Sequence, residues 1–307
     1  MPEEKPGVAV APQSVPWVEQ AIRDAGAAVV PAREADGLVW MSARRPEELG
    51  AVLGGAPSVR WVQLPLAGIE AFVEAGLLAD GRTWTCAKGI YADPVAEHAL
   101  GLAVAGLRDV VRSVRATSWG PPSGRVLTGG RVTIVGGGGI TRSLIRLLGP
   151  FGTVNTVVRQ RPEPVEGAHR TLAPDGLLEA LADADAVVLA LALTPANVGL
   201  IGAEELAAMP SHAWLVNVAR GRHVRTEDLV EALTKGTIGG AALDVTDPEP
   251  LPEGHPLWSL PNCVITPHIA NTPEMSVGPL IRLVRDNVGR FVRGEPLTGL
   301  VDPGLGY

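Results

Sequence analysis

The sequence RVTIVGGGGIT, residues 131–141, decides the fold class of this chain. Its first five residues are mostly apolar and β-branched, which predicts a buried β-strand. Four glycines follow directly, and Ser143–Leu148 then has the apolar spacing of a helix. Strand, glycine turn and helix in that order are the context of a dinucleotide-binding fingerprint.

Each position of this loop has an expected role. Gly136 permits the tight turn, and Gly138 lets the backbone approach a pyrophosphate at the start of the helix, beside Gly139 and Ile140. Thr141 replaces the third glycine of the fingerprint, so we expect it to push the helix outward and to weaken or shift cofactor binding. The alternative is an ordinary turn between a strand and a helix.

The end of the next predicted strand bears on the choice of cofactor. An acidic residue about 20 positions after the glycines normally holds the ribose 2′-hydroxyl of NAD. Here Arg159 and Arg161 stand at this place, and the first acid is Glu163. Guanidinium groups attract a 2′-phosphate, so we expect NADP(H) to be preferred, with NAD(H) as the alternative. The two arginines could also belong to an ordinary solvated loop.

Strands and helices alternate along the rest of the chain, which indicates an α/β protein with parallel sheets. A long helix is predicted over 95–118, and an amphipathic helix over 277–292. The predicted strands are 8–11, 28–31, 37–41, 59–64, 83–86, 132–135, 156–159, 186–193, 214–219, 240–245 and 264–266.

Composition excludes several classes of protein. The chain has 307 residues, 46% hydrophobic and 19% charged, which is enough for two domains with sizeable cores. Its 26 Lys and Arg against 33 Asp and Glu give a net charge of −7, which argues against nucleic-acid binding. No apolar run reaches the ~18 residues of a membrane helix, and no secretory signal is recognised. Cys86 and Cys263 lack metal-ligand spacing, so we expect a reduced, cytoplasmic protein.

Three polar residues follow three predicted strands at equal intervals of 24 residues. They are Arg220, Asp244 and His268. The carboxyl ends of parallel strands meet at one edge of a sheet, where ligands bind, so we expect these side chains to converge.

The chemistry of these residues is complementary. The arginine can grip a carboxylate or a keto oxygen, and His268 can deliver a proton to an oxygen near neutral pH. Glu249, in a proline-rich segment, is the candidate partner that keeps the histidine protonated. Among the other histidines, His98 on the predicted long helix is expected to be a packing or domain-contact residue, and His223 is expected to lie in a surface loop. No histidine pair has metal-ligand spacing, so no catalytic metal is expected.

Several blocks of sequence together resemble the D-isomer-specific 2-hydroxyacid dehydrogenase family. They are PVAEHAL at 94–100, the glycine loop, LTP at 193–195, GLI at 199–201, LVNVARG at 215–221, AALDV at 241–245, EP at 249–250, HPLW at 255–258 and TPHIA at 266–270. Their order agrees with the family throughout, whereas residues 1–93 match more weakly.

The resemblance implies a role for each of these positions. His268 is the proton donor, Glu249 its partner, and Arg220 binds the substrate carboxylate and polarises the carbonyl. Asp244 faces the nicotinamide carboxamide. The implied cofactor-binding set also includes Leu193, Thr194, Pro195, Val218, Ala219 and Ala270. The implied substrate-binding glycine turn consists of Leu66, Ala67 and Gly68.

The resemblance also implies the domain organisation. A Rossmann domain, residues 96–273, is inserted into a flavodoxin-like substrate domain of residues 1–95 and 274–307. Family members are typically dimers joined through their cofactor domains. The two arginines and the ending at 301–307 look most like the NADP-using glyoxylate/hydroxypyruvate reductases. The alternative function is a catalytically weak nucleotide-sensing protein of the same fold, and a flavoprotein fits less well.

Overall fold

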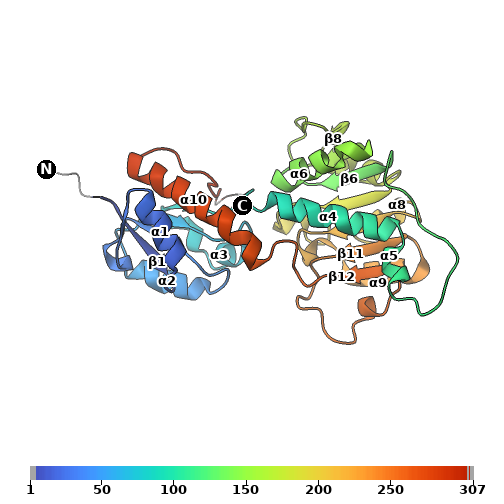
Figure 1. Cartoon of the computed structure of the whole chain (residues 1–307), viewed down its shortest axis with the longest axis horizontal. Coiled ribbons are helices and arrows are strands. Elements are labelled where there is room, and N and C mark those ends of the chain that lie inside the picture. The colour runs from blue at the N-terminus through green and yellow to red at the C-terminus, as the bar shows by residue number, and fades with distance from the viewer. Residues whose placement is uncertain (1–4, 303, 305–307) are drawn as a thin grey trace. The chain divides into compact units, whose positions relative to one another are not determined.

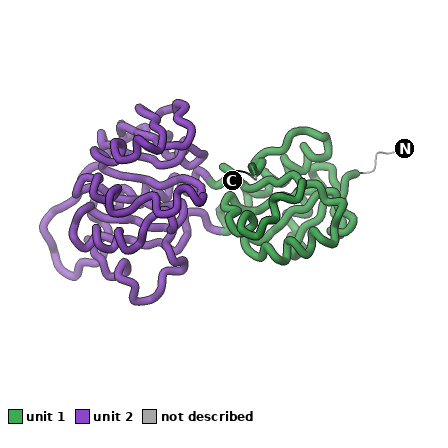
Figure 2. Tube along the Cα trace, turned by 180° about the vertical axis from the view of Figure 1, so that it is seen from behind, with its two compact units in different colours: residues 1–91, 273–307 green, residues 92–272 purple. Residues whose placement is uncertain are grey.

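The computed structural model describes residues 5–302 and 304. It divides the chain into two compact units (Figure 2). Unit 1 comprises Met1–Tyr91 and Pro273–Tyr307, and unit 2 comprises Ala92–Thr272. Unit 2 is therefore one continuous stretch that interrupts unit 1.

Unit 1 is built on a parallel sheet with the strand order β2-β1-β3-β4-β5. This order is that of the flavodoxin-like fold. The strands are β1 (Gly7–Ala11), β2 (Ala28–Val29), β3 (Gly37–Trp40), β4 (Trp61–Gln63) and β5 (Thr83–Thr85). The helices are α1 (Pro16–Asp24), α2 (Pro46–Gly54), α3 (Glu70–Glu74) and α10 (Pro273–Arg293).

Unit 2 contains a larger parallel sheet with the order β12-β11-β10-β9-β6-β7-β8. Its first six strands in chain order follow the Rossmann arrangement 3-2-1-4-5-6, with β12 added at one edge. The strands are β6 (Arg131–Val135), β7 (Val154–Val158), β8 (Arg170–Leu172), β9 (Ala186–Leu189), β10 (Trp214–Asn217), β11 (Gly240–Leu243) and β12 (Cys263–Ile265). The helices are α4 (Ala92–Leu107), α5 (Val110–Ser113), α6 (Gly139–Leu148), α7 (Leu177–Leu181), α8 (Ala203–Ala208) and α9 (Thr226–Lys235). The predicted fold class is confirmed.

Helices cover both faces of each sheet, which explains why most of the strand residues are buried (Figure 1). In unit 2, α4 and α6 pack on one face, and α7, α8 and α9 pack on the other. In unit 1, α1 and α10 share one core cluster, and α2 and α3 share another. Among the described residues, no helix is both long enough and apolar enough to cross a membrane.

One predicted element was wrong in detail, and one strand was missed. The helix predicted over 95–118 ends at Leu107, because Asp109 adopts a left-handed conformation with φ of 56° and only the short α5 follows. The edge strand β8 was not predicted, since its three residues carry no apolar alternation. Within the ending at 301–307, residues 303 and 305–307 lie outside the described part of the chain.

Candidate active site

The residues singled out in unit 2 follow the carboxyl ends of neighbouring strands. From β12 to β7, the edge carries His268, Asp244, Arg220, the Leu193–Pro195 segment, the glycine loop and Arg159. Strands lie about 4.8 Å apart, so these positions span roughly 24 Å. An edge of this length suits an extended ligand with chemically different ends. His268 lies at one end and Arg159 at the other.

His268 and Glu249 form a direct pair. The Nδ1 atom of His268 lies 2.7 Å from Oε1 of Glu249. The two side chains are 50% and 38% exposed, so the pair is open to a ligand. His268 has a left-handed backbone with φ of 53°, and its amide donates to the carbonyl of Asp244 at 2.9 Å. The contact with the glutamate engages Nδ1 of the imidazole and not Nε2.

Arg220 is positioned by two buried residues. Its carbonyl accepts a hydrogen bond from Nδ2 of Asn217 at 2.9 Å and lies 3.1 Å from Nδ1 of His223. The Oδ1 atom of Asn217 in turn accepts from the amide of Ala219 at 3.0 Å. His223 is fully buried, so its expected place in a surface loop was wrong. The backbone around the arginine is therefore held from inside the unit.

Asp244 directs its carboxylate to the segment that carries His268. Its Oδ1 accepts from the Thr266 hydroxyl at 2.6 Å and from the Ile269 amide at 2.9 Å. Its Oδ2 accepts from the Ala270 amide at 3.0 Å, and the residue is 2% exposed. Burial alone would raise the pKa of Asp244, but hydrogen bonds from His98, Thr266 and the two amides outweigh it and lower the pKa.

The glycine loop has the geometry of a phosphate-binding turn. Gly136 has φ of 119°, and a Cβ atom there would lie 2.2 Å from the carbonyl oxygen of Ala190. A Cβ atom on Gly138 would meet nothing within 4 Å, so that side of the loop is open. Helix α6 begins at Gly139, followed by Ile140, and its first amides point toward the loop.

Thr141 is built into this loop. Its side chain is fully buried, and its hydroxyl donates to the carbonyl of Gly136 at 2.8 Å. The threonine therefore braces the turn through this hydrogen bond.

The two arginines after β7 differ in their surroundings. The side chain of Arg159 passes close to Gly137, where a Cβ atom would lie 2.7 Å from its Nε. Its guanidinium is 3.8 Å from the carboxylate of Glu163, a long and exposed ion pair. Arg161 is exposed. Arg159 thus places its cation directly beside the glycine loop.

The other predicted cofactor residues lie along the same edge of unit 2. The amide of Thr194 donates to Oδ1 of Asn197 at 2.8 Å, which fixes the turn from Leu193 to Pro195. Val218 and Ala219 are buried between β10 and the arginine, and Ala270 is buried after β12.

The predicted substrate turn lies in unit 1, between β4 and α3. Leu66 and Ala67 are exposed, and Gly68 is half-buried. The Tyr91 hydroxyl donates to the Pro65 carbonyl at 2.7 Å, and the Ala87 amide donates to the Leu66 carbonyl at 3.1 Å. Burial raises the pKa of Tyr91 to about 12, so its phenol remains a donor.

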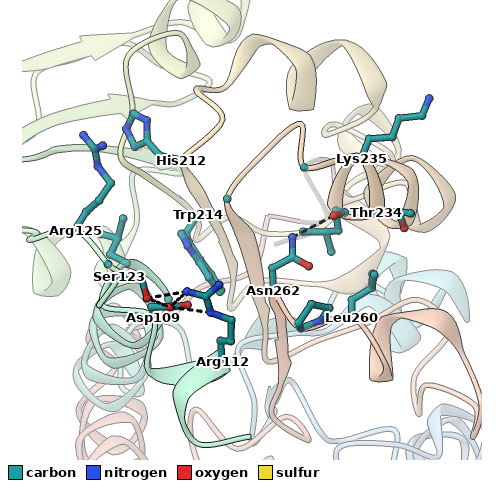
Figure 3. A pocket seen from close by; sticks show the side chains of 17 residues that line it. Asp109, Arg112, Ser123, Arg125, His212, Trp214, Thr234, Lys235, Leu260 and Asn262 are labelled. Carbon is teal, nitrogen blue, oxygen red and sulfur yellow. Dashed lines mark hydrogen bonds and ion pairs between the residues drawn. The ribbon is translucent and has the colours of Figure 1, made fainter. Parts of the chain in front are cut away.

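A hollow of about 590 Å³ opens at the opposite edge of the sheet in unit 2 (Figure 3). Trp214, Gly239 and Asn262 line it, and they lie at the amino ends of β10, β11 and β12. The hollow is therefore separate from the polar residues at the carboxyl ends.

Three residues near the site were not predicted to act in it. Asn217 carried a signal, since it is the polar residue of an apolar strand. His223 and His98 carried none, because their partners are set by the fold: Nε2 of His98 lies 3.1 Å from the Thr266 hydroxyl, 168 residues away.

The site can now be compared with known proteins. The model of the D-isomer-specific 2-hydroxyacid dehydrogenase NAD-binding domain matches residues 99–270. An uncharacterized protein of Corynebacterium melassecola is 43% identical over 227 residues, 72% of this chain and 75% of that protein. The human glyoxylate reductase/hydroxypyruvate reductase is 36% identical over 217 residues, 68% of this chain and 66% of the human protein.

A solved structure extends the likeness to nearly the whole chain. The D-isomer-specific 2-hydroxyacid dehydrogenase of Xanthobacter autotrophicus Py2, in complex with NADPH and MES, superposes with a TM-score of 0.84 at 27% identity. The alignment covers 99% of this chain and 100% of that one. A likeness of this extent shows that the chain belongs to the D-isomer-specific 2-hydroxyacid dehydrogenase family of oxidoreductases.

Proposed function

We propose that this protein reduces a small 2-keto acid of the glyoxylate or hydroxypyruvate type to the 2-hydroxy acid, with NADP(H) as cofactor. The observation that carries the proposal is the 2.7 Å pair of His268 and Glu249 at the sheet edge that also bears Arg220 and the glycine loop. The name of the human relative, glyoxylate reductase/hydroxypyruvate reductase, supports the substrate class.

The proposed mechanism divides the work among three side chains. The reduced nicotinamide supplies a hydride to the keto carbon when it is bound. His268 gives a proton from Nε2 to the keto oxygen as that oxygen becomes an alkoxide. Glu249, on Nδ1, holds the imidazole and stabilises its protonated form. Arg220 binds the substrate carboxylate and polarises the carbonyl.

Two further binding roles belong to the proposal. The amides of Leu66, Ala67 and Gly68 in unit 1 bind the substrate carboxylate, which makes unit 1 the substrate domain and unit 2 the cofactor domain. Asp244 faces the nicotinamide carboxamide.

The preference for NADP(H) rests on Arg159 and Arg161. Arg159 lies beside the glycine loop, and the sequence from 154 to 162 contains no acidic residue. The NADPH complex of the Xanthobacter enzyme is in line with this choice. Arg159→Ala is expected to raise the dissociation constant for NADPH about tenfold, the effect of losing one charge-assisted contact, and to leave NADH binding within about twofold.

The first experiment is a turnover assay that follows nicotinamide absorbance. Glyoxylate, hydroxypyruvate, pyruvate and a bulkier 2-keto acid are each tested with NADPH and with NADH. Rapid oxidation of NADPH with the small acids is the expected result. Preference for NADH would contradict the role of the two arginines and leave the mechanism standing. Cofactor binding without turnover would instead favour the nucleotide-sensing alternative.

Variants then test the assigned roles. His268→Ala is expected to lower kcat by at least about a hundredfold, the usual contribution of a general acid, while NADPH binding stays unchanged. Glu249→Gln keeps the shape of the partner and removes its charge, so it should lower kcat less. Turnover that survives in His268→Ala would show that another group donates the proton.

We also propose that the protein is a cytoplasmic homodimer. Val110, Val114, Trp119 and Val126 are exposed apolar residues on one segment of unit 2, and Trp119 is fully exposed. Burial against a second copy would remove this surface from water. The buried free thiols Cys86 and Cys263 suit a reducing compartment. Light scattering should give twice the 31.9 kDa of the chain, and Trp119→Asp should shift the mass toward one copy.

A further inference from the structure

We propose that His98 is a positioning residue for the proton donor: through Thr266 and Asp244, it orients the backbone that presents His268 to its partner Glu249. The inference deepens the proposed function and rests on it, because it assigns the support of the acid in that reaction. His98 lies on α4, far in sequence from every other member of the site.

Asp244, which follows β11, accepts hydrogen bonds from the segment that carries His268, whose own amide also donates to the Thr266 carbonyl at 2.9 Å. Three successive amides, those of His268, Ile269 and Ala270, donate to Asp244. The first reaches its carbonyl at 2.9 Å, the second its Oδ1 at 2.9 Å and the third its Oδ2 at 3.0 Å. Since His268 has a left-handed backbone, which disfavours side-chain-bearing residues, the segment needs such external bonds to keep its shape.

The carboxylate of Asp244 is itself held by two side chains. The Thr266 hydroxyl donates to Oδ1 at 2.6 Å, and Nε2 of His98 lies 3.3 Å from the same oxygen. Nε2 is also 3.1 Å from the Thr266 oxygen. Asp244 is 2% exposed, so water does not compete effectively for these contacts.

Counting protons fixes the direction of the contact with His98. The single hydroxyl proton of Thr266 goes to Asp244, so the threonine oxygen is left as an acceptor toward the imidazole. The carboxylate of Asp244 accepts hydrogen bonds from amide and hydroxyl groups on both oxygens, so it too can only be an acceptor toward His98. Nε2 of His98 must therefore carry a proton and donate it into this network. This histidine thus connects α4 to the segment that carries His268.

The test compares variants that keep or remove this donor. His98→Leu removes it at similar volume, whereas His98→Gln places an amide N–H near the position of Nε2. We expect His98→Leu to lower kcat with NADPH about tenfold, the cost of one lost charge-assisted hydrogen bond, and to leave KM and the NADPH dissociation constant within about twofold. His98→Gln should recover most of kcat. Thr266→Val and Thr266→Ser form a second pair with the same expected contrast.

A second readout does not need turnover. Amide hydrogen exchange, measured by NMR, should be about tenfold faster at Ile269 and Ala270 in His98→Leu and unchanged along β11. If the wild-type protein reduces no keto acid, the proposed function fails, while this measurement still decides whether His98 supports the segment.

His212→Leu is the matched control. His212 makes the same kind of contact, with Nε2 at 2.8 Å from Oδ1 of Asp185, whose other oxygen accepts the Arg131 amide at 2.8 Å. This triad lies at the amino ends of the strands, so the control should loosen the Arg131 amide and leave kcat unchanged.

Three results would overturn the inference. They are unchanged kcat and unchanged exchange in His98→Leu, equal damage in His98→Leu and His98→Gln, or an equal loss of kcat in the control. Urea unfolding of every variant identifies any that fails to fold. If a His98 variant fails to fold, the contrast in kcat between Thr266→Val and Thr266→Ser decides whether the inference stands.

Discussion

Two glycines of the same loop should fail in different ways when each is given a side chain. A Cβ atom on Gly136 would lie 2.2 Å from the carbonyl oxygen of Ala190, and backbone atoms cannot move aside as a flexible side chain would. A Cβ atom on Gly138 would meet nothing within 4 Å. Gly136→Ala should therefore damage the fold, and Gly138→Ala should damage cofactor binding alone.

The expected losses of unfolding free energy follow from the backbone conformation of each glycine and from the clash of the added Cβ atom. An alanine at φ of 119° has a conformation that costs about 1–2 kcal/mol, and forcing a methyl group into a packed turn costs about 1–3 kcal/mol. We expect Gly136→Ala to lower the free energy of unfolding by about 3 kcal/mol, which moves the urea midpoint by about 1 M. Gly138 has φ of −86°, which alanine adopts freely, so Gly138→Ala costs no more than about 1 kcal/mol through weaker helix capping.

For NADPH binding we expect the opposite order, with the larger loss in Gly138→Ala. The pyrophosphate is expected to lie against Gly138, so the added methyl group should raise the dissociation constant for NADPH at least about tenfold. Urea unfolding followed by circular dichroism and titration with NADPH measure the two effects separately. Normal NADPH affinity in Gly138→Ala would refute the close approach of a phosphate to this backbone. If Gly136→Ala has the same urea midpoint of unfolding as the wild type, the inference that Gly136 is needed for a tight turn is refuted.

Three other outcomes follow from buried groups. Thr141→Val removes the hydroxyl that braces the glycine turn and should cost about 1–2 kcal/mol, as read by urea unfolding against Thr141→Ser. Burial raises the pKa of the Cys263 thiol to about 12 and that of Cys86 above its ordinary 9.0, so neither should react with a thiol reagent at neutral pH until the chain is unfolded. Because the pKa of Asp244 is below its ordinary 3.8, its ionised form stabilises the fold above that pH, and the contribution is lost as the pH falls through the lower folded value. The stability advantage of the wild type over Asp244→Asn should therefore shrink as the pH falls from about 5 to below the ordinary 3.8, and a constant difference would contradict the linkage.

The sequence predicts the sheet edge well because its signals are local. The strand before Gly136 and the helix after it are both visible in about twenty residues, and parallel strands place their carboxyl ends together whatever the connections. The positions of Arg220, Asp244 and His268 on three adjacent strands follow from this rule.

The remaining features depend on contacts distant in the chain or on one residue's backbone. The end of α4 depends on the left-handed conformation of Asp109, whose carboxylate also bonds Arg112 and Ser123. The spacing of apolar residues along the sequence does not indicate a left-handed conformation at a single residue. The partners of His98 and His223 are set by the folded arrangement of strands and helices. The sequence around each histidine therefore predicted only packing or a domain contact for His98 and exposure for His223.

The interrupted course of unit 1 has a consequence for the order in which the protein can form. Unit 2 is continuous, and its core is complete once residue 272 has left the ribosome. The core that α1 shares with α10 lacks Leu280, Val284 and Val288 until the last tenth of the chain is made. The first strands synthesised therefore wait, with one face of their sheet uncovered, while the later segment completes its own fold. Folding of unit 1 is thus tied to the synthesis of α10.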